Sequence, residues 1–183
     1  MASTKEQVRS ALLVLRFRRG DDRAMEELIS LWERPLFYYV RRLVNSEEDT
    51  WDALQEVWCQ VIRKIGKLRD PGAVATWLYK IAHNSAVGHL RRQTACERLP
   101  EDDAPEMADG DTELALPEVD AVEIHRALDR LSLPHREILT LRFLEGFSLV
   151  EISEITEVSV GTVKSRLHYA KRAMRDLLEG RLS

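Results

Sequence analysis

Apolar residues recur at steps of three and four along most of this 183-residue chain, the spacing that gathers them on one side of an α-helix. The alternation typical of strands does not occur, so we predict an all-α protein. The first predicted helix ends near Gly20, and its apolar side is formed by Val8, Leu12, Leu15 and Phe17.

Three further helices are predicted before residue 94. One begins after a cap at Asp22, and Pro35 either kinks it or separates it from a new helix. Another begins at Ser46, and a turn over residues 70–72 precedes the last, from about Ala73 to Arg92. Their expected inward-facing residues are Met25, Leu28, Ile29, Leu31 and Trp32, then Trp51, Leu54, Val57, Trp58, Val61, Ile62 and Ile65, and finally Val74, Leu78, Ile81, Ala82 and Leu90.

Four helices are predicted in the last third of the chain. The first covers residues 122–131, the second runs from Pro134 to near Gly146, and two more follow with a short turn between them. Ser148 with Glu151 three residues later is the pattern of a capping box, and Ser159 is a candidate N-cap for the final helix. In that helix one apolar stripe is expected to face inward: Val160, Val163, Leu167, Ala170, Met174 and Leu177.

The outward side of the final helix has the residue types that DNA-reading helices use. Cations hold phosphates, while hydroxyl and forked donors reach base edges in the major groove. We therefore predict a helix-turn-helix whose second helix reads DNA. The predicted DNA-binding residues are Ser159, Thr162, Lys164, Ser165, Arg166, His168, Lys171 and Arg172.

Two earlier helices carry polar residues whose role the pattern leaves open. Around Trp77, an aromatic beside Lys80 and Asn84, followed by paired arginines, suits a single-stranded base and its backbone. The alternative is that Trp77 and Tyr79 are core residues at helical spacing, since aromatic side chains are mostly buried. The polar side formed by Asp52, Gln55 and Glu56 indicates, by itself, only a solvated helix face.

Composition and charge divide the chain into three parts. The net charge is −4, yet residues 94–120 hold ten Asp or Glu against one arginine, together with three prolines. This segment is expected to be an acidic linker, either a solvated tether or a mimic of nucleic acid in a basic channel. We therefore predict helical domains over residues 1–93 and 121–183, joined by this linker.

Several classes of function are disfavoured. The chain has no phosphate loop, serine elbow or clustered nucleophile, so no catalytic residue is predicted. The five histidines and two cysteines show no metal-ligand spacing, so no metal or other cofactor is expected. Neither a membrane span nor a signal peptide is evident, and the low cysteine content favours the cytoplasm.

Taken in order, these segments resemble the extracytoplasmic-function (ECF) group of bacterial RNA polymerase sigma factors. DALQEVW and WLYKIAHN, within residues 24–93, are similar to sigma region 2, and LSLPHREILTLRFLEGFSLVEISEITEVSVGTVKSRL, within residues 121–178, to region 4. The resemblance implies a subunit that binds core RNA polymerase and directs promoter-specific initiation.

The resemblance also implies a role for each candidate residue. Asp52, Gln55 and Glu56 would bind the β′ clamp helices of polymerase. The loop over residues 67–75 and the helix after it would bind and melt the −10 element, through Trp77, Tyr79, Lys80, Asn84, Arg91 and Arg92. The final helix would read the −35 element.

Further partners implied by the resemblance are the β flap of polymerase, promoter DNA and an anti-sigma factor, with the linker near the RNA exit channel. The chain departs from the family in having Glu157 where a turn glycine is common, and residues 71–74 in place of a loop aromatic. The alternative function is a DNA-binding activator of the response-regulator type, which needs an alternating strand–helix receiver domain.

Overall fold

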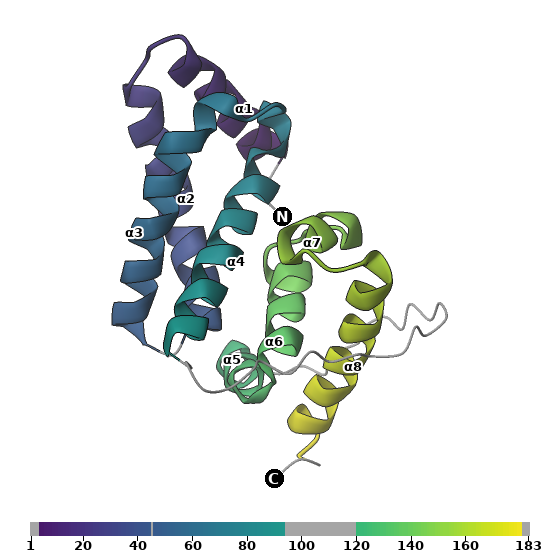
Figure 1. The fold of residues 1–183 in the computed structure, drawn as a ribbon. Coiled ribbons are helices and arrows are strands. Elements are labelled where there is room, and N and C mark those ends of the chain that lie inside the picture. Colours follow the sequence, from purple (N-terminus) through teal and green to yellow (C-terminus); the bar gives the residue numbers. More distant parts are fainter. Residues whose placement is uncertain (1–3, 45, 94–119, 181–183) are drawn as a thin grey trace. The chain divides into compact units, whose positions relative to one another are not determined.

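The computed structural model describes residues 4–44, 46–93 and 120–180, and every regular element within those ranges is helical. The all-α prediction is confirmed for this part of the chain. The chain forms two compact units, drawn in Figure 1 as a purple-to-teal bundle and a green-to-yellow bundle. The predicted linker lies outside the described residues, except for Asp120, which is the N-cap of the helix that follows it.

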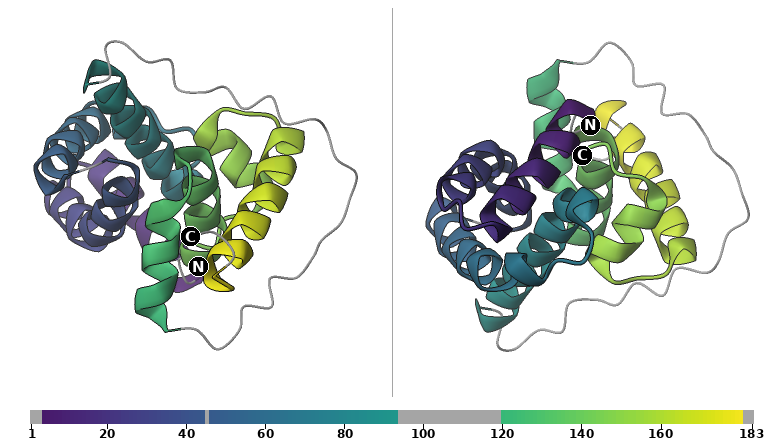
Figure 2. Two further views of the ribbon diagram at one scale, coloured as in Figure 1. Left: turned by 90° about the horizontal axis from the view of Figure 1, so that it is seen from below. Right: turned by 90° about the horizontal axis from the view of Figure 1, so that it is seen from above.

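The first unit is a bundle of helices, which Figure 2 shows from both ends. α3 packs chiefly against α4, and α2 packs against both α1 and α3. The elements are α1 (Thr4–Arg18), α2 (Arg23–Leu43), α3 (Glu47–Lys64), the short 3-10 turns η1 (Ile65–Lys67) and η2 (Pro71–Ala73), and α4 (Val74–Gln93).

Local signals mark the starts of α3 and η2, whereas Asp22, the predicted cap of α2, occupies the N-cap position without a side-chain capping hydrogen bond. α2 continues through Pro35, which decides between the two possibilities that the sequence left open. Ser46 caps α3, since its Oγ accepts a hydrogen bond from the backbone N–H of Asp49 at 3.0 Å. Asp70 caps η2 in the same way, accepting from the N–H of Gly72 at 2.8 Å. These caps satisfy backbone donors that a helix start leaves free.

The predicted apolar side of α1 is wrong. Val8 and Leu12 are 65% and 55% exposed, whereas Leu13 and Val14 are buried. The reason is Ser10, a polar residue that enters the core because both its hydrogen-bonding roles are met. Its Oγ donates to the carbonyl of Glu6 at 2.7 Å and accepts from Trp32 Nε1 at 3.0 Å.

The apolar stripe predicted for α3 is wider than the part that is buried. Leu54, Val57 and Val61 lie in the core, but Trp51 is 44% and Ile62 52% exposed. These two residues lie at one edge of the stripe, where α3 has no neighbouring helix to cover them in full. Trp51 packs there against Phe37 of α2, with ring centroids 4.7 Å apart.

The second unit contains the four helices that the sequence predicts, with one change of hydrogen-bonding pattern. After α6 the chain enters a π-type segment, in which the N–H of Glu145 donates to the carbonyl of Thr140 at 3.0 Å. α8 packs against α6 and α5. The elements are α5 (Ala121–Arg130), α6 (Leu133–Leu139), the π-type segment η3 (Thr140–Leu144), α7 (Leu149–Thr156) and α8 (Val160–Leu178).

Candidate nucleic-acid and protein interfaces

The segment from α7 to α8 has the local geometry of a helix-turn-helix. The capping box of α7 is present: the N–H of Glu151 donates to Ser148 Oγ at 3.2 Å, and the N–H of Ser148 donates to Glu151 Oε2 at 2.8 Å. Ser159 caps α8, accepting from the N–H of Thr162 at 3.0 Å. Both start signals read from the sequence are confirmed.

The turn between these helices depends on Glu157. This residue ends α7 with φ 57° and ψ 31°, the left-handed region that favours glycine. Ser153 Oγ donates to the carbonyl of Val158 at 2.6 Å and so closes the turn from the side of α7. The chain therefore adopts a left-handed turn without the glycine that eases it.

α8 has the two-sided character that a reading helix needs. Val163, Leu167, Ala170 and Met174 are buried, which confirms the centre of the predicted stripe. Lys164, His168 and Arg172 are exposed and follow one another at steps of four, so they form one row on the helix surface.

The remaining predicted residues of α8 divide between partial exposure and burial. Thr162, Arg166 and Lys171 are partly exposed. The Nε of Arg166 is buried and has no hydrogen-bond partner among the described residues, while Lys171 Nζ lies over the ring of Phe143, 5.8 Å from its centroid.

The prediction that Ser165 faces outward is wrong, because this residue is only 2% exposed. Its hydroxyl turns back and donates to the carbonyl of Thr162 at 3.1 Å. A short side chain that bonds its own helix does not extend to a ligand surface.

α4 separates the predicted −10 residues by face. Trp77, Lys80, Asn84 and Arg91 are separated by three, four and seven residues, which places them on one side of the helix. Asn84 and Arg91 are exposed, and Trp77 and Lys80 partly exposed. This row combines an aromatic ring, an amide and two cations.

Tyr79 does not belong to this row. It lies on another side of α4 and is 1% exposed. Its ring packs between Tyr39, at a centroid distance of 4.9 Å, and Trp32, at 6.2 Å in an edge-to-face arrangement. The assignment of Tyr79 to DNA binding is contradicted by this position, because a ring enclosed by two others cannot stack on a base.

The three polar residues predicted on α3 are all exposed. Glu56 is also tied to α4: its Oε2 accepts from Ser85 Oγ at 3.1 Å, and its Oε1 lies 2.8 Å from Arg92 Nη2. Arg92, predicted for DNA, therefore contacts a residue predicted for polymerase.

Sequence reasoning missed an exposed aromatic cluster beside these residues, formed by Phe37 and Tyr38 of α2 and Trp51 of α3. Tyr38 is 54% exposed, with the guanidinium of Arg34 5.6 Å from its ring centroid. The available signal was the run of three aromatics at 37, 38 and 39, which cannot all face the core from one helix; Tyr39 is the buried one.

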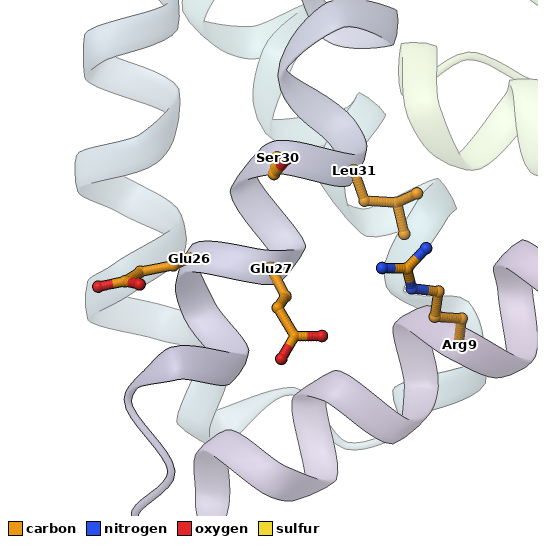
Figure 3. A pocket seen from close by; sticks show the side chains of 5 residues that line it. All are labelled: Arg9, Glu26, Glu27, Ser30 and Leu31. Atoms are coloured by element: carbon orange, nitrogen blue, oxygen red, sulfur yellow. The ribbon is translucent and has the colours of Figure 1, made fainter.

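A pocket of about 390 Å³ lies between α1 and α2 and contains none of the predicted site residues. Figure 3 shows Arg9 reaching from α1 toward Leu31 of α2, with Glu27 also directed to this side and the Glu26 side chain directed away from Arg9; Ser30 completes the lining. Arg16 Nη2 also contacts Glu27 Oε1 at 3.0 Å. The Arg16–Glu27 ion pair across the two helices makes this pocket a structural feature of the α1–α2 contact.

The described residues contain no group of three or more histidine, cysteine or acidic side chains suited to a metal ion. None of the helices in this part of the chain has the length and apolar character needed to cross a bilayer.

Comparison with known families matches both units. The model of sigma-70 region 2 matches residues 14–96, and that of sigma-70 region 4 matches residues 121–174. Two solved structures share the fold: CnrH in complex with the cytosolic domain of CnrY, at a TM-score of 0.67 and 20% identity over 95% of this chain and 99% of that one, and the Bartonella quintana sigma factor RpoE in complex with the anti-sigma factor NepR, at 0.65 and 20% over 84% and 96%.

Whole-length relatives are closer in sequence. The RNA polymerase sigma-H factor of Pseudomonas aeruginosa is 32% identical, covering 91% of this chain and 92% of that protein. The ECF RNA polymerase sigma-E factor of Haemophilus influenzae is 33% identical, with 95% and 97% covered, and that of Escherichia coli K12 is 32% identical, with 92% and 94% covered. The chain therefore belongs to the ECF group of the sigma-70 family of RNA polymerase sigma factors.

Proposed function

We propose that this protein binds core RNA polymerase and directs it to promoters, as a subunit without enzymatic activity of its own. The observation that carries the proposal is the occurrence in one chain of regions 2 and 4, each with a polar row on an exposed helix face. Region 2 binds polymerase and the −10 element, and region 4 reads the −35 element. The domain limits of 1–93, 94–120 and 121–183 are part of this proposal.

For the −35 element, α8 enters the major groove with its N-terminal half. Lys164, His168 and Arg172 form the exposed row that contacts phosphates and base edges. Ser159 and Thr162 lie at the start of the helix, where backbone N–H groups favour a phosphate. Arg166 and Lys171 contribute from the edge of this row, and Ser165 has no direct contact.

For the −10 element, the row on α4 holds the displaced strand. Trp77 stacks an unpaired base, and Asn84 bonds a base edge. Lys80 and Arg91 hold the phosphates. The loop over residues 67–75 leads into α4 and is tied to α1, because Arg18 Nη2 donates to the carbonyl of Leu68.

For polymerase, Asp52, Gln55 and Glu56 are the exposed contacts of α3 with the β′ clamp helices. Region 4 contacts the β flap, and the protein acts in the bacterial cytoplasm. An anti-sigma factor is a further proposed partner. Two proteins that share the fold, CnrH and RpoE, have been solved with CnrY and with the anti-sigma factor NepR, respectively.

The response-regulator alternative needs a receiver domain of alternating strands and helices. Residues 4–44 and 46–93, where that domain would lie, contain helices and no strand. A third possibility, an adaptor that binds only protein, gives the exposed cations of α8 no ligand.

A gel-shift experiment separates these functions. The probe is a duplex pool with randomised −10 and −35 segments, added to the protein with and without core polymerase. Selection of specific duplexes only when core is present supports the sigma-factor proposal. Specific binding without core indicates an activator, and no binding in either case indicates an adaptor.

A pair of variants connects this assay to α8. The slope of log affinity against log salt is negative, and Lys164→Ala should reduce its magnitude by about 0.9, the contribution of one phosphate contact on duplex DNA. Arg126→Ala removes an exposed cation of α5 in the same unit and should leave the slope unchanged. Equal effects of the two variants would contradict the assignment of α8.

A further inference from the structure

Glu56 is shared between two helices that the proposed function assigns to different macromolecules. It belongs to α3, the polymerase helix, but both its carboxylate oxygens are engaged by α4, the −10 helix. The single hydroxyl proton of Ser85 is shared between Oε2, at 3.1 Å from Oγ, and the carbonyl of Ala53, at 3.0 Å, while Arg92 Nη2 donates to Oε1 at 2.8 Å. The position of the Arg92 guanidinium is therefore set by α3.

Arg91 and Arg92 are adjacent in sequence but face different ways. Arg91 continues the row of Trp77 and Asn84, which lie fourteen and seven residues before it. Arg92 is rotated by about 100° from that row. It belongs instead with Ser85, seven residues earlier, on the side of α4 that contacts α3.

The contact between α3 and α4 does not depend on the Glu56–Arg92 pair alone. One turn away, His89 Nε2 lies 2.8 Å from Asp49 Oδ1, and these two side chains are only 14% and 18% exposed. The Arg92 and Glu56 side chains, by contrast, are 58% and 46% exposed. The pair can separate without opening the helix contact, because the more buried pair and the apolar core stay in place.

We propose that the Glu56–Arg92 ion pair withholds Arg92 from nucleic acid in the free protein, and that polymerase binding at Glu56 releases it to hold the −10 strand. The inference rests on the proposed function. A carboxylate that accepts a hydrogen bond from a polymerase side chain attracts the Arg92 guanidinium less strongly. The long side chain of Arg92 then turns toward the row that contains Arg91. Recruitment to polymerase thus adds one cation to the −10 surface.

The strength of the pair suits such an exchange. An exposed ion pair at this distance shifts the equilibrium between the paired and the released Arg92 side chain by about fivefold at most. Binding of polymerase can replace that interaction easily, and yet a fivefold change in affinity for single-stranded DNA is readily measured. The withheld cation accounts for one phosphate contact, not for the whole polymerase dependence of promoter binding.

The test is a double-mutant cycle on the full-length protein without polymerase. The probe is labelled oligothymidylate of about 20 nucleotides, a sequence-independent ligand for a stacking and phosphate surface. Arg92→Gln is measured in the wild type and in Glu56→Gln, which keeps an oxygen for Ser85. Arg91→Gln, the neighbouring arginine on the exposed row, is the matched control.

If the pair withholds Arg92, Arg92→Gln should change wild-type affinity by less than about 1.5-fold, but should lower that of Glu56→Gln by about three- to fivefold. Arg91→Gln should have the same effect in both backgrounds. Equal effects of Arg92→Gln in the two backgrounds would overturn the proposal. Thermal unfolding of each variant shows whether the bundle is intact, and Glu56→Ala replaces Glu56→Gln if it is not.

A second measurement adds core polymerase to the chain with Glu56 intact. Arg92→Gln should then weaken binding to a promoter selected from the randomised pool as much as Arg91→Gln does, although it has little effect without core. If Arg92→Gln has no effect in the complex either, release does not occur and the proposal is wrong. Failure of the wild type to select any promoter with core would instead contradict the proposed function itself.

Discussion

Replacing Tyr79 with alanine distinguishes a core residue from a DNA contact. The ring is 1% exposed and packs between Tyr39 and Trp32, at centroid distances of 4.9 and 6.2 Å. Truncating a buried aromatic to alanine costs about 3–5 kcal/mol, which combines the lost burial with the cavity that remains. The two ring pairs account for about 0.5–1.5 kcal/mol each within that figure.

A loss of this size is large for a single helical unit. Domains commonly unfold with about 5–15 kcal/mol, so Tyr79→Ala should remove a large share of the stability of the first unit. At about 4–8 °C for each kcal/mol in a domain of this size, its melting temperature should fall by at least about 12 °C. Weaker DNA binding would follow only from the loss of fold.

Urea unfolding followed by tryptophan fluorescence measures this effect in the intact chain. All four tryptophans, at 32, 51, 58 and 77, precede residue 94, so their fluorescence reports on the first unit alone. Asn84→Ala is the control: an exposed residue of the same helix, whose loss should change stability by less than about 0.5 kcal/mol while weakening oligonucleotide binding. A Tyr79→Ala protein as stable as the wild type, but defective in binding, would refute the core assignment.

Three further predictions concern other parts of the chain. Glu157→Val should destabilise the second unit by about 1–2 kcal/mol in thermal unfolding, because a β-branched residue tolerates the left-handed turn poorly, whereas Glu157→Gly should stay within about 1 kcal/mol of the wild type. Arg166→Ala should weaken −35 recognition by about 1–3 kcal/mol and relax the choice at one base pair in promoter selection, and unchanged selection would assign Arg166 to the phosphates or to packing. The hydrogen bond from Arg16 lowers the pKa of Asp21 below its ordinary value. The ionised Asp21 therefore stabilises the fold above its ordinary pKa, and this stabilisation is lost as the pH falls through the folded pKa. Asp21→Asn should flatten the loss of stability between about pH 5 and pH 2, and an unaltered pH profile would contradict this.

Local signals in the sequence were sufficient to place most helices. Ser46, Ser148 and Ser159 each precede an apolar-periodic run, and each accepts the backbone hydrogen bond expected of a cap. Such signals act over three or four residues, so they can be read without knowledge of the fold. For the same reason the inward stripe of α8 was predicted correctly at its centre.

Which side of a helix is buried depended on partners that the sequence does not show. The serine at position 10 is buried because Trp32, twenty-two residues away, donates to it, and no local pattern contains that contact. Trp51 and Ile62 lie at the edge of the α3 stripe, and only the packing of α2 and α4 decides that this edge is left exposed. The enclosure of Tyr79 likewise depends on rings from α2.

In the candidate site, too, the sequence predicted what depends on a single helix and missed what depends on contacts between helices. Trp77, Lys80, Asn84 and Arg91 share a face because they belong to one helix, so their arrangement follows from spacing alone. The contact of Arg92 with Glu56 joins residues thirty-six positions apart, and motif comparison assigned the two to different partners. Such a pair becomes visible only when both helices are placed.

Run-off transcription with purified core polymerase on a library of randomised promoters tests the central claim most directly. The protein should direct initiation from a subset of templates that share −35 and −10 sequences, and core alone should not use them. A double variant, Asp52→Ala with Gln55→Ala, should lose this activity while remaining folded, because its targets are exposed side chains of α3. If the wild-type protein directs no specific initiation on any template, the assignment of a promoter-recognition function is wrong.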